Sequence, residues 1–225
     1  MDLRNLFFNM LIPIKNNQVT KLIPSVATAG QFKYSLGNPR KILQRVIISS
    51  IGAAITLVIG NNQFGNQTDV LWLILCLTFA LYILWGPILE ASRKNLKYKQ
   101  FKFFSIFDGF ISDVYQTEKI ESSREQTNRY GNLEIVENKR TWLTIELEDE
   151  DGYLSKISFP FENRHNVISR GLKVRCLVST NERQFNGKLF LTDAWLPEIN
   201  LWVGDYPYLL RPAFEEFCFI YKNKF

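Results

Sequence analysis

The chain has 225 residues, of which 46% are hydrophobic, and a formal net charge of +5. This length suits one soluble domain of about 100–120 residues with an appended segment. The charge is uneven: residues 1–102 hold 12 Lys/Arg and 3 Asp/Glu, a net +9, whereas residues 103–225 hold 15 and 19, a net −4. This split argues against a nucleic-acid-binding domain, which would carry the positive charge on its folded part. The three cysteines are widely spaced, which argues against a disulfide framework or a zinc site.

The first 41 residues lack the pattern of a signal peptide. Leu6–Ile14 is apolar, but Asn9 and Pro13 interrupt it and no clean small-residue cleavage site follows. We expect residues 1–41 to form an interfacial segment that lies along a membrane.

Two apolar segments predict a transmembrane helical hairpin over residues 42–89. Val70–Leu89 contains 20 residues and no charge, and at 1.5 Å per residue it covers roughly 30 Å, the thickness of a hydrocarbon core. Ile42–Gly60 is the weaker span, because Arg45 lies at its entrance. Small residues on this span are expected to let the second helix approach closely; they are Ser49, Gly52, Ala53 and Thr56.

The charges around the two spans predict their orientation. The connecting loop, residues 61–69, contains no Lys or Arg, whereas basic residues flank both spans, which places both chain ends on the cytoplasmic or stromal side. Residues 90–102 form a basic juxtamembrane linker. Its basic side chains are candidate ligands for anionic lipid headgroups, each contributing about 1 kcal/mol, although a topology signal alone accounts for the same charges. They are Arg93, Lys94, Lys97, Lys99 and Lys102.

Residues 103–225 predict a mostly β soluble domain with a C-terminal helix. Alternating apolar residues indicate strands, and Asp149–Gly152 and Asn186-Gly187 are typical of turns. Residues 120–130 are polar throughout and are expected to form an exposed loop. Strands at this spacing favour a small OB-like or SH3-like barrel, with a sandwich of two small sheets as the alternative. The expected fold class is therefore α+β, a transmembrane hairpin joined to a barrel-like domain.

An aromatic and proline-rich segment, residues 196–210, follows the last expected strand. We favour packing of this segment across the domain; the alternative is a docking surface, because Trp and Tyr provide large anchors. The docking candidates are Trp202, Asp205, Tyr206 and Tyr208. Pro212 then suits the first turn of a final helix, with one apolar face made of Phe214, Phe217, Cys218 and Tyr221.

Four stretches stand out as motifs. They are Leu22-Ile23-Pro24 with Ala27-Thr28-Ala29-Gly30, then Leu84-Trp85-Gly86-Pro87, Ile135-Val136-Glu137-Asn138, and Leu201-Trp202-Val203-Gly204-Asp205-Tyr206-Pro207-Tyr208-Leu209. Together they resemble a cyanobacterial and plastid-lineage family of two-span membrane proteins, whose members are often labelled phosphate ABC transporter permeases. The resemblance implies a photosynthetic membrane as the setting. The permease label fits these residues poorly, because transporters place substrate sites between several helices at the midplane.

The sequence contains no P-loop, nucleophile elbow or His-Glu-x-x-His motif. His165, the sole histidine, is expected to be a solvated or capping residue, and the acidic run at residues 146–151 a solvated hairpin tip, since no calcium-loop spacing fits. We expect no enzymatic activity and no cofactor. The predicted function is a membrane-anchored interaction module in the thylakoid or plasma membrane, an accessory or assembly factor of a photosynthetic complex that binds a membrane-protein partner. A transport-associated subunit is the alternative.

Overall fold

The computed structural model describes residues 11–63, 69–127, 133–149, 152–183, 185 and 188–221. The chain divides into two compact units, a helical unit over Ile23–Gln100 and a β unit that combines the residues before Ile23 with those from Phe101 onward. The α+β class is confirmed at this level. The division differs from the expected boundaries, because part of the segment over residues 1–41 pairs with the sheet and part packs in the helical unit.

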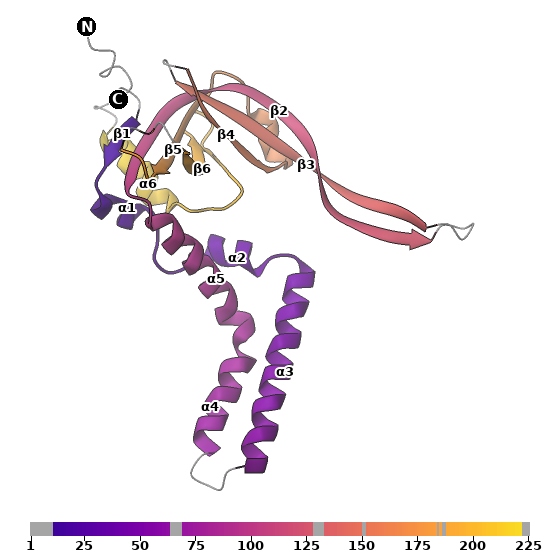
Figure 1. The fold of residues 1–225 in the computed structure, drawn as a ribbon. Coiled ribbons are helices and arrows are strands. Elements are labelled where there is room, and N and C mark those ends of the chain that lie inside the picture. The colour runs from indigo at the N-terminus through magenta and orange to yellow at the C-terminus, as the bar shows by residue number, and fades with distance from the viewer. Residues whose placement is uncertain are drawn as a thin grey trace. The chain divides into compact units, whose positions relative to one another are not determined.

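Helices α2 (Ala29–Leu36), α3 (Pro39–Gln63), α4 (Asp69–Ala80) and α5 (Tyr82–Lys99) form the helical unit. Figure 1 shows α3 and α4 running side by side, and α2 lies against α5. The start of α2 follows from its sequence. Thr28 caps it by accepting the Gln31 N–H, and the Gln31 side chain accepts the Thr28 N–H in return, a capping box that satisfies two backbone donors.

The segment Val70–Leu89, expected as one 20-residue span, is broken at Leu81. Helices α4 and α5 meet there at a bend of 67°. The indole N–H of Trp85 donates to the Thr78 carbonyl at 2.8 Å, and so replaces the backbone donor that the next helical turn would supply. Pro87, inside α5, removes another donor from the ladder. The break lacks a glycine or proline of its own, so composition did not reveal it.

Among the described helices, one passes a test of length and apolar character for a membrane span, from Pro39 to Gly60 within α3. The pair Val70–Ala80 and Tyr82–Lys99 passes only if both pieces are counted as one bent span. As a candidate membrane span, Ile42–Gly60 is therefore better supported than Val70–Leu89, the reverse of what composition predicts. The reason is that the uncharged stretch is divided between two helices, whereas the stretch containing Arg45 is one continuous helix.

The β unit contains a seven-stranded antiparallel sheet in the order β4-β3-β2-β5-β6-β7, with β1 paired to β2. Its strands are β1 (Leu11–Ile14), β2 (Phe103–Thr127), β3 (Leu133–Asp149), β4 (Gly152–Pro160), β5 (Lys173–Thr180), β6 (Phe190–Leu196) and β7 (Leu201–Val203). The other elements are α1 (Asn16–Leu22), the short 3₁₀ helix η2 (Asn163–Val167) and α6 (Arg211–Tyr221). The hairpin at Asp149–Gly152 is confirmed; the turn expected at Asn186-Gly187 lies outside the described residues.

Strand β2 is 25 residues long and pairs with three other strands, including β1 at residues 104–107. Residues 103–110 pair with β5, and residues 110–127 pair with β3. Past the end of β4, the strands β2 and β3 pair only with each other and extend from the sheet as a two-stranded arm, residues 118–127 and 133–141 (Figure 1). The loop expected over residues 120–130 is thus strand as far as Thr127. Exposed apolar side chains lie along this arm: Ile120, Leu133, Ile135 and Val136.

The core of the β unit lies where β2–β6 face inward, and Phe107, Ile145 and Cys176 are fully buried there. Phe214 and Cys218 of α6 are also fully buried, which confirms the expected apolar face of this helix at these two positions. Phe217 is half-buried, and the side chain of Tyr221 lies outside the described part of the chain. All three cysteines are free thiols.

Candidate functional site

Most of the surface of α3 and α4 is apolar. Large exposed hydrophobic side chains on α3 are Leu43, Val46, Ile47, Ile48, Ile51, Ile55, Leu57, Val58 and Ile59, and those on α4 are Val70, Leu71, Leu73, Ile74, Leu75, Leu77 and Phe79. Only 17% of the α3 span is buried inside the structure. A helix that is apolar all round normally lies in a protein core or a membrane, and an exposed apolar surface of this extent marks a membrane or protein contact.

The remaining face of α3 forms a close contact with α4. Ser49 and Thr56 are buried on it, and a Cβ atom at Gly52 would lie only 2.6 Å from the Phe79 ring. The Thr56 hydroxyl donates to the carbonyl oxygens of Gly52 and Ala53, so it needs no partner on α4. Of the small residues expected at the helix–helix contact, Gly52 lies in it against Phe79, and its size lets the two backbones approach.

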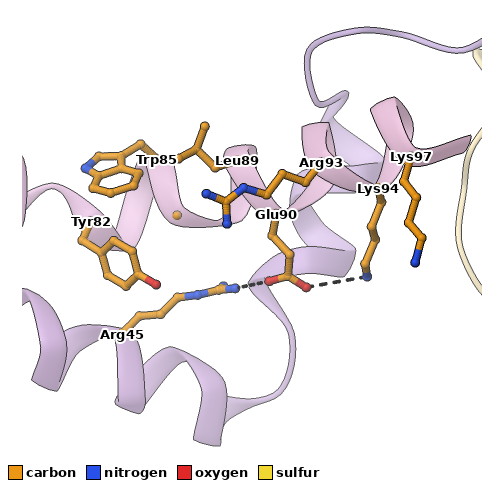
Figure 2. A pocket seen from close by; sticks show the side chains of 9 residues that line it. Arg45, Tyr82, Trp85, Leu89, Glu90, Arg93, Lys94 and Lys97 are labelled. Atoms are coloured by element: carbon orange, nitrogen blue, oxygen red, sulfur yellow. Dashed lines mark hydrogen bonds and ion pairs between the residues drawn. The ribbon is translucent and has the colours of Figure 1, made fainter. Parts of the chain in front are cut away.

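Helices α3 and α5 line an open pocket of about 560 Å³, within the range typical of small-molecule sites. Figure 2 shows that Arg45 reaches into it from α3 and that the other labelled side chains come from one face of α5. The lining residues are Arg45, Tyr82, Trp85, Gly86, Leu89, Glu90, Arg93, Lys94 and Lys97. We call this feature the basic pocket.

An ion-pair network crosses the basic pocket. The Arg45 Nη2 donates to the Glu90 Oε2 at 2.8 Å, and the Arg45 Nη1 donates to the Leu36 carbonyl at 3.1 Å. The Lys94 Nζ lies 3.6 Å from the Glu90 Oε1 and 4.9 Å from the centroid of the Tyr34 ring. Four basic side chains and one carboxylate line the pocket, a net charge of +3. Since Glu90 is engaged by two cations, the pocket attracts anions.

A buried amide pair holds α2 against α5 beside this network. The Gln31 Nε2 donates to the Asn95 Oδ1 at 3.2 Å, and the Asn95 Nδ2 donates to the Gln31 Oε1 at 2.9 Å. Both side chains are fully buried. Reciprocal hydrogen bonds of this kind satisfy polar groups that would be costly to bury alone, and they fix the rotation of α5 that presents its basic face.

The structure brings three of the five predicted headgroup ligands together in the basic pocket: Arg93, Lys94 and Lys97. Lys99 instead donates to the Ser25 Oγ at 2.9 Å, and Lys102 does not line the pocket. Sequence reasoning missed the contributions of Glu90 and of the aromatic residues on the same helix face. A signal was present, since Arg45 and Glu90 are the charges that flank the apolar hairpin at its two ends.

The docking candidates of the segment over residues 196–210 are largely internal. Trp202 is 7% exposed and Tyr206 is 6% exposed, and the Trp202 indole donates to the Glu215 Oε1 at 2.7 Å. Asp205 is exposed and Tyr208 is half-buried. The favoured interpretation, packing across the domain, is therefore confirmed for the two buried rings, which are unable to anchor a partner from the interior.

Asp193 is the buried acid around which this segment packs. Its Oδ1 accepts the Leu209 N–H at 3.0 Å. Burial raises the pKa of Asp193 to about 7, although the Leu209 N–H and the charge of Arg211 act to lower it. Gly204 passes close by with a φ of 152°, and a Cβ atom there would lie 2.8 Å from the Asp193 Cα. This cluster has a structural role.

His165 caps η2, which is one of the two roles expected for it, the other being a solvated side chain. It is 4% exposed, and its Nδ1 accepts the backbone N–H of Glu162 at 3.0 Å. Its ring contacts Phe159 edge-on, and burial, followed by the charge of Arg164, lowers its pKa. An imidazole held in this way acts as a neutral acceptor in the fold.

Comparison with known proteins gives a family but no activity. A family model with the description "Family of unknown function (DUF8619)" matches residues 12–219. The searches of curated proteins and of solved structures found no match. The function must therefore be argued from the residues themselves.

Proposed function

We propose a function for this chain, which belongs to the family of unknown function DUF8619: it is a membrane-anchored, non-enzymatic interaction protein. The helical unit is the anchor and the β unit is the module that binds a membrane-protein partner. The exposed apolar surface of α3 and α4 is the main support for the proposal that the helical unit is a membrane anchor.

The magnitude of that surface supports a lipid environment over water. Sixteen large apolar side chains are exposed on the described parts of α3 and α4. Burying one such side chain is worth about 1.5–3 kcal/mol, so leaving all of them in water costs on the order of tens of kcal/mol. The stability of a whole domain is about 5–15 kcal/mol. A bilayer removes this cost without a protein partner.

Helix length agrees with a membrane crossing. The 25 residues of α3 cover roughly 37 Å, which exceeds the hydrocarbon thickness of about 30 Å. The 12 residues of α4 cover only about 18 Å, so a second crossing needs the first turns of α5 after the bend. We propose that this bent pair returns to the side from which α3 entered.

The proposed orientation places both chain ends on the cytoplasmic or stromal side. Arg40 and Lys41 lie in the first turn of α3, and the basic pocket lies on α5 at the same end of the hairpin. Positive charge at this end of both limbs follows the positive-inside rule. Trp85, which lines the pocket, has the amphipathic side chain that favours the membrane interface.

The proposed interaction module is a partly open, OB-like barrel. Its support is the strand order, in which the long β2 joins β3 and β4 on one side to β5 and β6 on the other. The two-stranded arm adds exposed apolar side chains at Leu133 and Ile135. The family resemblance suggests a complex of a photosynthetic membrane as the partner, in thylakoid or plasma membrane.

One observation favours the alternative of a transport-associated subunit. Discontinuous helices occur at the substrate sites of transporters, and the α4–α5 break at Leu81 is such a discontinuity. The Trp85 indole already occupies the Thr78 carbonyl, however, so this break offers one fewer ligand to a solute. We therefore keep the interaction module as the first proposal.

Membrane fractionation followed by alkaline carbonate washing tests the anchor. We expect the full chain to stay in the pellet, and protease added from the cytoplasmic side to digest the β unit. Release by carbonate, or digestion only from the opposite side, contradicts the proposal. Co-purification in mild detergent then separates the candidates: recovery with a photosynthetic complex supports the module, and recovery with a permease or ATPase supports the transport alternative.

A further inference from the structure

We propose that the basic pocket binds the phosphate group of an anionic phospholipid, with the glycerol and upper acyl chain against its aromatic end. This inference deepens the proposed function and rests on membrane insertion of the helical unit. It differs from a general attraction of basic residues to the membrane, because it assigns one lipid to one pocket with a defined lining.

The pocket is polarised along α5. Tyr82 and Trp85 lie at one end, toward the break, and Arg93 and Lys97 lie at the other, as Figure 2 shows. Leu89 lies between these two pairs. A phospholipid has the same polarity, from charged phosphate through glycerol to hydrocarbon. Because aromatic side chains favour the interface and basic side chains the headgroup layer, the gradient also matches the depth at which each part of the lipid lies.

Two cations of the pocket are available for the phosphate. Arg45 and Lys94 are engaged with Glu90. Among the described residues, no ion pair involves Arg93 or Lys97, which are exposed and lie one helical turn apart. An arginine and a lysine at this spacing are neighbours on the helix surface, so both can contact one anion, and the arginine fork suits two phosphate oxygens.

Glu90 selects against a doubly charged ligand. Its carboxylate lines the same pocket and would repel a second negative charge close to Arg45. A phosphodiester carries one negative charge, whereas inorganic phosphate carries between one and two near neutral pH. The apolar wall formed by Trp85 and Leu89 would also remain without a partner if a free phosphate were bound. Charge and shape therefore both favour the lipid.

The test titrates the full chain in detergent with phosphatidylglycerol and counts the bound lipids by native mass spectrometry. Phosphatidylcholine and inorganic phosphate serve as competitors. We expect phosphatidylglycerol to bind in preference to phosphatidylcholine, and inorganic phosphate not to displace it. The variant Arg93→Gln/Lys97→Gln should bind phosphatidylglycerol about 25-fold more weakly, since each cation near a lipid surface contributes a factor of about five.

The matched control is Lys99→Gln/Lys102→Gln, which removes the same charge from the same basic linker but outside the pocket. It should bind within about twofold of the original chain. Equal weakening of both variants would show diffuse attraction and overturn the proposal, as would displacement of the lipid by inorganic phosphate or equal binding of phosphatidylcholine. The charge-conserving Lys97→Arg variant should retain binding, and the lipid preference of the original chain tests the proposal even if a variant fails to fold.

The two proposals fail separately. A chain that carbonate releases from membranes contradicts the anchor itself. A chain that stays in the membrane but shows no preference for phosphatidylglycerol leaves the anchor intact and removes only the lipid site.

Discussion

Arg45 of α3 and Glu90 of α5 form an ion pair at 2.8 Å between positions 45 residues apart in the chain. Arg45 is 8% exposed, and its second nitrogen donates to the Leu36 carbonyl. The pair therefore ties the first limb of the hairpin to the helix that follows the second limb.

Glu90→Gln should lower the stability of the helical unit by about 1–3 kcal/mol, because Arg45 then keeps its charge in a buried position without its counterion. Thermal unfolding in detergent, followed by circular dichroism, measures the loss. The double variant Arg45→Met/Glu90→Leu should recover most of it, since apolar residues can replace a buried pair at little cost. Additive losses in the double variant would show that the two side chains act independently.

Gly52→Leu should destabilise the α3–α4 contact by more than about 2 kcal/mol, because the added side chain meets the Phe79 ring and must displace it. Ala54→Leu is the control, since Ala54 lies on the exposed face of the same helix. Unfolding of the two variants in the same detergent gives the comparison. Equal stability would mean that α3 and α4 are not packed through Gly52.

Asp193→Asn should remove a pH dependence of the β unit. The folded pKa of about 7 lies above the ordinary aspartate pKa of 3.8, so between these values the folded state retains a proton that the unfolded state has released. The free energy of unfolding of the β unit is therefore highest at low pH. It falls by on the order of 4 kcal/mol as pH rises from about 4 to 7. Denaturant unfolding at several pH values measures it.

Glu182→Gln is the control for this pH dependence, because Glu182 is exposed. It should keep the slope of the original chain. An unchanged slope in Asp193→Asn would show that the carboxyl group is ionised in the folded β unit throughout this range.

Gly204→Ala should destabilise the β unit by about 2 kcal/mol or more, since both a positive φ and a close approach to Asp193 oppose a side chain there. Gly171→Ala separates the two effects, because Gly171 has a φ of 84° but open space around it. The Gly171 variant should lose only about 1 kcal/mol. Similar losses in both would indicate that the contact with Asp193 relaxes freely.

Apolar periodicity predicted the elements that have a buried face and misjudged those that have none. The strands ending at Asp149 and beginning at Gly152, and the face of α6 with Phe214, follow directly from alternation and helical spacing. Residues 120–127 of the arm were expected to be part of a loop, because neither face of the arm is covered and these residues show no apolar alternation. The arm is stabilised by backbone hydrogen bonds between β2 and β3, and a pattern of apolar side chains does not predict such bonds.

The sequence predicted the basic residues of the basic pocket but not their arrangement. Arg93, Lys94 and Lys97 stand in an obvious basic run, but the run does not indicate which of its members face one another. The choice depends on the rotation of α5, which the Gln31–Asn95 pair sets from 64 residues away. The break at Leu81 was hidden for a related reason: it is stabilised by the Trp85 side chain seven residues from Thr78, and no local breaker marks it.

Strand β2 also has a mechanical consequence. It begins at Phe103, a few residues after α5 ends at Lys99, and continues without interruption into the arm at Thr127. A load applied along this strand acts on the hydrogen bonds to β5 and β3 together, in shear, so they must yield collectively instead of one at a time. Forced unfolding depends on the rate of that collective step. A partner that pulled on the arm would transmit tension along a single strand to the chain segment that follows α5.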